Sequence, residues 1–153
     1  MRTIRVERRI AAPIEQVFEV LSDHAQYARF PGIRRAELIS PGRAERNGLG
    51  AIRRVLIGPL RFEEEITAFE RPTRLDYLIV KINAPFRHQG GSIRLEDAGD
   101  GTTDALWTSV YEIPVPLLGP VLERLFANRF GNGFDDVLST TEELAAEPVP
   151  AAT

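Results

Sequence analysis

The sequence has no cysteine and only two histidines among its 153 residues. Without cysteine there is no disulfide framework and no thiolate metal site, and two histidines without acids at ligand spacing do not predict a zinc centre. The patterns GxxxxGK[ST], HExxH and GxSxG are absent as well. GLGAIR (residues 48–53) has arginine where a dinucleotide fingerprint needs its third glycine. We therefore expect no metal and no cofactor.

Long apolar runs are also missing. None approaches the roughly 20 residues that cross a bilayer, so we expect no integral membrane segment. The first ten residues, MRTIRVERRI, alternate charged and apolar side chains and lack the continuous apolar stretch of a secretory signal. Nothing points to export, and we expect a cytoplasmic protein.

Positive charge is not in excess, because the net charge is -3 and the pI is about 5.5. Arginines recur in pairs, but acids are interleaved with them along the chain. Binding to a phosphate backbone needs a clustered basic surface. We therefore expect no nucleic-acid partner.

The pattern of apolar residues predicts one α+β domain over residues 1–147, followed by a disordered tail at 148–153. A strand at residues 3–10 precedes two short helices, in AAPIEQVFEVLSD and HAQYARF, the second capped by Asp23. After these the period changes to two, and tight connections between strands favour antiparallel pairing. The six further strand segments are residues 33–40, 51–57, 60–70, 74–82, 86–96 and 103–113.

A long helix is predicted at the end of the domain, because apolar residues recur every four positions from Leu118 to Leu138. We expect it to cover a curved antiparallel sheet of about seven strands, since no other element is long enough. Gly131 and Gly133 lie within this helix, although a glycine in a helix interior costs about 1 kcal/mol relative to alanine. Three explanations stay open: a bend that lines a pocket, a break into two helices, or close packing on the sheet.

The order of elements and five segments point to one superfamily. The segments are APIEQVFEVLSD, YARFPGI, GLGAIRRV, ITAFERPTRLDY and GDGTTDALWTSVYEIP. Over residues 2–146 the chain resembles the START/Bet v 1-like (SRPBCC) superfamily, and within it the bacterial polyketide cyclase/dehydrase and lipid-transport branch. The resemblance implies a helix-grip fold, in which the sheet grips the last helix and an elongated cavity lies between them. None of the shared motifs is a catalytic signature.

The segment at 103–113 predicts which side chains face inward. Asp104 and Glu112 mark the outer face of this strand, so Trp107, Ser109 and Tyr111 face inward. In the resembled fold, inward means toward the cavity, and aromatic side chains with one polar tip suit ligand recognition. Core packing explains the same residues equally well. The candidate ligand-binding residues are Tyr27, Phe30, Tyr77, Trp107, Ser109, Tyr111, Phe126, Phe130 and Phe134.

Glu64 is a candidate for a buried carboxylate, because it shares the strand parity of Phe62 and Ile66. A buried carboxylate needs a partner, and Arg54, on the apolar parity of its own segment, is the candidate. Such a pair would bind a polar headgroup or polarise a carbonyl. The alternative is a bulge, or a position at the sheet edge, that exposes Glu64.

His88 is the candidate general acid or base, since the usual pKa of histidine is about 6.5. Strand parity places it with Ser92 and Arg94 on the solvent face. A bulge at Gly90 and Gly91 would interrupt that parity.

Three functions stay open at this point. The first is binding of a hydrophobic small molecule, such as a lipid, an isoprenoid or a polyketide-like compound. The second, implied by the resemblance, is an enzyme that catalyses aldol cyclisation and water loss; Arg54 would stabilise an oxyanion, Tyr111 or His88 would transfer protons, and Glu64 would orient. The third is a protein-interaction or stress-response module, which needs an exposed apolar patch. A homodimer is compatible with each.

Overall fold

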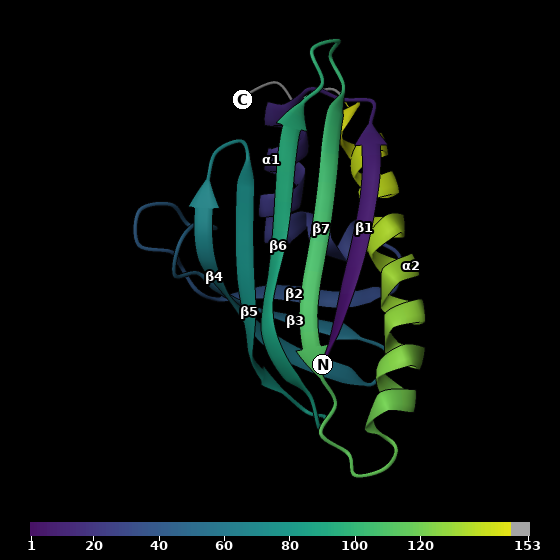
Figure 1. Ribbon diagram of the computed structural model, residues 1–153. Coiled ribbons are helices and arrows are strands. Elements are labelled where there is room, and N and C mark those ends of the chain that lie inside the picture. The colour runs from purple at the N-terminus through teal and green to yellow at the C-terminus, as the bar shows by residue number, and fades with distance from the viewer. Residues whose placement is uncertain (148–153) are drawn as a thin grey trace.

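The computed structural model describes residues 1–147, and within them one long helix lies against a bent antiparallel sheet (Figure 1). The expected tail at 148–153 falls outside the described residues. In chain order the elements are β1 (Arg2–Ile10), α1 (Ile14–Ser22), the 3-10 helix η1 (His24–Arg29), β2 (Ile33–Ser40), β3 (Ile52–Ile57), β4 (Leu60–Glu70), β5 (Arg74–Ile82), β6 (Arg87–Asp97), β7 (Thr103–Glu112) and α2 (Gly119–Ala145).

The strands form one seven-stranded sheet in the order β1-β7-β6-β5-β4-β3-β2. From β2 to β7 each strand pairs with its neighbour in sequence, as the short connections predict. β1 pairs with β7, so the link through α1 and η1 connects the two edges of the sheet. The side chain of Asp23 caps η1 by accepting from the backbone N–H of Ala25 at 3.0 Å. The predicted α+β helix-grip architecture is confirmed.

The apolar core lies where α1 and the C-terminal half of α2 pack on the sheet. Alternation along β1 buries Ile4 and Ile10 while Arg5 and Arg9 stay exposed, as a strand with one covered face requires. The core around them includes Val17, Phe18, Leu21, Ile66, Leu75, Ile93, Leu95, Ala105 and Leu138. None of the helices within residues 1–147 is long and apolar enough to cross a membrane.

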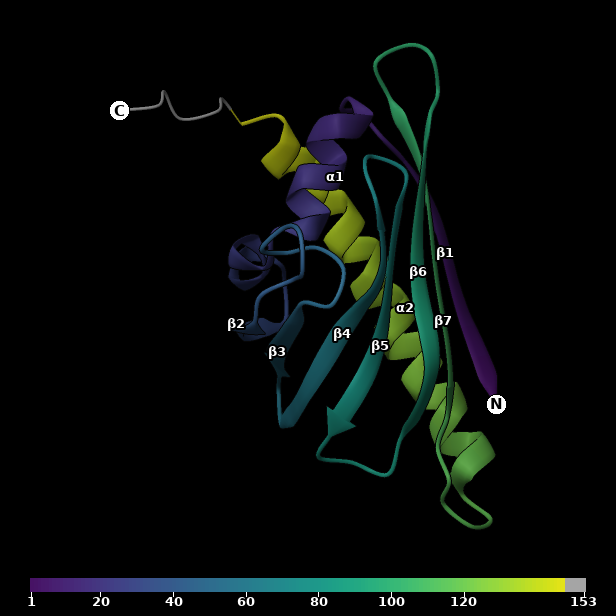
Figure 2. The same ribbon diagram turned by 90° about the vertical axis from the view of Figure 1, so that its left-hand side faces the viewer.

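Helix α2 is buried unevenly along its length. It packs mainly on β1 and α1, and Figure 2 shows it crossing the inside of the bent sheet. Its C-terminal half buries Val137, Leu138 and Thr141, whereas Leu118 and Leu122 at its start are 58% and 36% exposed. The predicted apolar face is therefore covered only over part of the helix.

The two glycines do not interrupt α2, which runs unbroken from Gly119 to Ala145. The break into two helices, one of the three explanations, is therefore wrong. A Cβ added at Gly131 would lie 3.8 Å from Cγ2 of Ile4, an ordinary contact, and one at Gly133 would meet no atom within 4 Å. Close packing therefore does not explain the glycines either. Gly133 faces open space inside the molecule.

Replacing either glycine with alanine, Gly131→Ala or Gly133→Ala, should raise the free energy of unfolding by about 0.5–1 kcal/mol, because alanine restricts the unfolded chain and favours the helix. Urea denaturation of the two variants and the wild type measures the change. A loss of stability in either variant would show that the helix needs glycine there for a bend.

Candidate functional site

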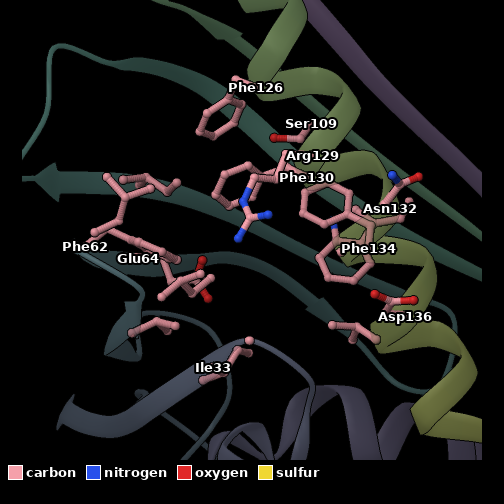
Figure 3. Close-up of a pocket in the computed structure, with 18 of the residues that line it drawn as sticks. Ile33, Phe62, Glu64, Ser109, Phe126, Arg129, Phe130, Asn132, Phe134 and Asp136 are labelled. Carbon is pink, nitrogen blue, oxygen red and sulfur yellow. The ribbon is translucent and has the colours of Figure 1, made fainter.

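An apolar cavity of about 570 Å³ lies between α2 and the concave face of the sheet (Figure 3). Strands β3 to β5 and the connection from β5 to β6 supply apolar side chains to its wall, including Val55, Ile57, Phe62, Ile79, Ile82 and Phe86. On the other side, Phe126, Phe130 and Phe134 project from α2 toward these strands. Gly133 lines the cavity on the same helix. A concave, largely apolar space of this size is typical of a small-molecule site.

The aromatic rings along α2 support one another at the cavity wall. The rings of Phe126 and Phe130 stack with centroids 3.9 Å apart, and those of Trp107 and Phe134 stack at 4.1 Å. Phe86, just before β6, approaches Phe126 at 5.0 Å. These contacts hold the rings in place without filling the space, so the wall is shaped before any ligand enters.

Seven of the nine predicted ligand-binding residues line the cavity: Tyr27, Tyr77, Trp107, Ser109, Phe126, Phe130 and Phe134. Phe30 does not, since it is buried edge-on against the ring of Tyr27. Tyr111 is not part of the lining either. It faces inward as predicted and is fully buried, but its hydroxyl donates to the backbone oxygen of Glu123 at 2.5 Å. That bond uses the hydroxyl proton that acid–base chemistry would need.

Glu64 is buried at the cavity wall and pairs with Arg53 rather than with the predicted Arg54. The Nε atom of Arg53 lies 2.5 Å from Oε1 of Glu64, and the two residues are 4% and 5% exposed. The Arg53 guanidinium also lies over the ring of Tyr27, 4.4 Å from its centroid, a favourable cation–π geometry. Burial acts to lower the pKa of Arg53, but the charge and hydrogen bond of Glu64, together with Tyr27 and Tyr77, raise that pKa overall. Arg53 therefore keeps its charge, and its ion pair with Glu64 balances that charge inside the protein.

Arg54 points to the outer face of the sheet, where it pairs with Glu63 at 2.8 Å and Glu37 at 3.2 Å. The strand register explains this, because Arg53 lies opposite Glu64 and Arg54 opposite Glu63, and opposite residues share a face. The sequence prediction was wrong because it took the apolar residues Ile52 and Leu56 as the inner row. The inner row contains Val55, which is buried.

The bulge considered for Glu64 is present, but on the neighbouring strand. In the pairing of β4 with β5, Glu63 lies opposite Lys81 and Glu64 opposite Ile79, so the extra residue is Val80. Glu64 therefore keeps its inward direction, as its strand parity indicated, and the alternative that exposed it was wrong.

His88 also points inward, which corrects its predicted place on the solvent face. The register of β6 shifts between His88 and Gly90, where Gly90 has φ 140°, as a bulge requires. The Nδ1 atom of His88 accepts from the backbone N–H of Ile79 at 2.9 Å, and Nε2 lies 2.9 Å from Oγ of Ser109. Burial lowers the pKa of His88 to about 4, so the ring is neutral at pH 7. Neither ring nitrogen offers a free lone pair to a ligand.

Tyr77 and Trp107 extend this polar cluster. The indole N–H of Trp107 donates to the hydroxyl of Tyr77 at 2.9 Å, and burial raises the pKa of Tyr77. Gly91 makes room for the phenol ring, because a Cβ there would lie 2.1 Å from Cζ of Tyr77. We call Tyr77, His88, Trp107 and Ser109 the polar cluster.

Two charged residues at the cavity were missed from the sequence. Arg53 could have been found because it lies on the same strand face as Val55, an apolar residue that is expected to be buried. Arg129 lines the cavity from α2, is exposed, and has no ion-pair partner within residues 1–147; Figure 3 shows its side chain directed from the helix into this space. Its position three residues after Phe126, on the same helical face, is the signal that could have found it.

An exposed apolar patch adjoins the cavity at the start of α2. It consists of Leu117, Leu118, Val121, Leu122 and Leu125, which are between 36% and 98% exposed. Leu125 belongs to both the patch and the cavity lining. We call these five residues the α2 patch. The described residues contain no group of three or more acidic or histidine side chains arranged to hold a metal ion.

The sequence matches a protein family described as polyketide cyclase / dehydrase and lipid transport over residues 1–145. No curated protein matches it. Among solved structures, a protein of Thermus thermophilus is 21% identical, with a TM-score of 0.78, over 94% of this chain and 97% of its own.

Two further structures share the fold. A START superfamily protein from Mycobacterium smegmatis is 16% identical with a TM-score of 0.78, over 92% of this chain and 97% of its own. Norcoclaurine synthase from Thalictrum flavum, in complex with dopamine and hydroxybenzaldehyde, is 14% identical with a TM-score of 0.71, over 97% of this chain and 89% of its own. At these identities the likeness concerns the fold alone.

Replacing Arg53 with methionine should lower the free energy of unfolding by about 3–5 kcal/mol, because Glu64 is left buried without its partner. Arg54→Met is the matched control: its ion pairs are partly exposed, so their loss should change stability much less. The double variant Arg53→Met, Glu64→Leu should recover most of the loss. Urea denaturation measures all three, and equal losses for Arg53→Met and Arg54→Met would contradict the assigned pairing.

Proposed function

Since the chain belongs to the polyketide cyclase/dehydrase and lipid transport family of the START/Bet v 1-like superfamily, we propose that it binds a hydrophobic small molecule between the sheet and α2. The candidates are a lipid, an isoprenoid or a polyketide-like compound. One observation carries the proposal: a preformed cavity of about 570 Å³ with mainly aliphatic and aromatic walls. Moving an apolar ligand from water into such a space is favourable in proportion to the apolar area buried.

The charges at the cavity support a ligand whose inner part is neutral. Arg53 and Glu64 cancel each other, and His88 is neutral at pH 7 because burial lowers its pKa to about 4. A buried ionic group on the ligand would therefore find no opposite charge without a partner. At the cavity edge, the exposed guanidinium of Arg129 is placed to bind an anionic or polar end of the ligand.

The enzymatic alternative is less well supported by the geometry. Aldol cyclisation and water loss were assigned to Arg54, Glu64 and Tyr111 acting together, with His88 as a further proton carrier. Arg54 lies on the outer face, and the hydroxyl of Tyr111 is bonded to Glu123 outside the lining. These groups do not converge on a substrate, so the binding function is the better account of the cavity.

The interaction alternative has one observation in its favour, which is the α2 patch. An exposed apolar surface of this kind is typical of contact with another molecule. It adjoins the cavity through Leu125, so such a contact would take place beside the cavity.

Filling the cavity from Gly133 tests the proposal. A side chain there has open space in front of it, so Gly133→Phe should place a ring in the cavity without disturbing the core. We expect the neutral fluorescent probe N-phenyl-1-naphthylamine to bind the wild type with one-to-one stoichiometry, and the variant at least roughly tenfold more weakly, which corresponds to about 1.4 kcal/mol. Fluorescence titration measures both dissociation constants.

The matched control is Glu143→Phe, which adds the same ring to an exposed position of α2 outside the lining. It should bind the probe as the wild type does. Equal affinity of Gly133→Phe and the wild type would place the probe elsewhere and contradict the proposal. Circular dichroism of both variants checks that α2 is intact.

A further inference from the structure

The polar cluster is small enough for its hydrogen bonds to be counted. It joins Tyr77 on β5, His88 on β6, and Trp107 and Ser109 on β7. Tyr77, Trp107 and Ser109 line the cavity, while His88 lies behind Ser109. Tyr77 and Ser109 are 6% and 5% exposed. A buried polar group is costly unless it is bonded, so the position of every hydrogen in the cluster matters.

The tautomer of His88 follows from its neighbours. A backbone N–H can only donate, so the bond from Ile79 requires an unprotonated Nδ1. The ring is neutral at pH 7, so its single hydrogen is on Nε2. Nε2 therefore donates to Oγ of Ser109 at 2.9 Å. In this state His88 cannot take the hydroxyl proton of Ser109, and the pair is not an activated nucleophile.

Two hydroxyl hydrogens remain to be placed. Oγ of Ser109 accepts from His88, and the hydroxyl oxygen of Tyr77 accepts from the indole of Trp107. Even if one hydroxyl donated to the other, the second could not donate back at the same time. Neither hydroxyl donates a hydrogen bond to another group within residues 1–147, so at least one O–H remains free at the cavity wall.

We propose that the cavity selects ligands that carry a carbonyl-type acceptor oxygen, which receives the free hydroxyl hydrogen of the Ser109–Tyr77 pair. The inference rests on the proposed binding function and narrows its ligand class. The wall supplies a fixed donor in apolar surroundings, where a neutral acceptor is favoured over a hydrocarbon. A hydrocarbon ligand would leave this hydroxyl hydrogen without an acceptor. A ketone on an otherwise apolar skeleton satisfies both the donor and the walls.

The test compares two probes with the same rigid skeleton, 9-fluorenone and fluorene, which differ in one carbonyl. Each is titrated against the protein loaded with N-phenyl-1-naphthylamine, and its displacement gives a dissociation constant. We expect the wild type to bind fluorenone roughly three- to tenfold more tightly than fluorene, the ratio that one neutral hydrogen bond supports. The infrared carbonyl band of bound fluorenone should also move to lower frequency than in hexane.

The double variant Tyr77→Phe, Ser109→Ala removes both hydroxyls and should lose the preference for fluorenone. Ser92→Ala is the matched control, because Ser92 donates to Asp76 at 2.6 Å on the outer face and should leave the ratio unchanged. If the double variant does not fold, the infrared band of the wild-type complex decides the question alone.

The outcomes separate this inference from the binding function. Equal binding of the two probes by the wild type, or an unshifted carbonyl band, overturns the inference and leaves the cavity as a binding site. Failure of fluorene, fluorenone and N-phenyl-1-naphthylamine alike to bind overturns the binding function, and the inference with it.

Discussion

One packing constraint underlies the site: a single helix cannot fill the concave side of a long, bent sheet. α2 lies against β1 and α1, and its C-terminal half closes the core around Leu138. Opposite β3 to β5 the helix stands back from the strands, and the space between them is the cavity. The rings of Phe130 and Phe134 face this space and are held by stacking on neighbouring rings. Gly133 has no side chain to fill the space at the middle of the helix. The cavity therefore depends both on the bend of the sheet and on the glycine at this position.

Polarity inside the cavity is limited and almost fully compensated. The ion pair of Arg53 and Glu64 cancels its own charge, which is how a buried charge is tolerated. In the polar cluster, a backbone N–H fixes His88, and His88 in turn fixes Ser109. What remains is one uncommitted hydroxyl hydrogen among apolar walls. A site built in this way can orient a ligand through one group while the hydrophobic effect supplies most of the affinity.

The sequence predicted the elements and most inward faces, because strand alternation and helical spacing are local signals. The predictions failed where the direction of a side chain depended on the register between neighbouring strands. Arg53 and Arg54 are adjacent arginines, and only the register opposite Glu64 decides which one is buried. A bulge reverses the face of His88, and the sequence shows only that Gly90 permits one. Tyr111 faces inward as predicted, but its hydroxyl donates a hydrogen bond to the backbone of α2. The sequence predicts this helix but does not show where it packs.

The central claim is that apolar ligands bind in the cavity rather than on the α2 patch, and nuclear Overhauser effects distinguish the two surfaces directly. The protein would be labelled at its methyl groups and saturated with N-phenyl-1-naphthylamine. The account predicts contacts from the probe to the methyl groups of Val55, Ile79 and Ile82, which line the cavity. Contacts to Leu117 and Leu118 alone, which lie on the patch outside the lining, would contradict it.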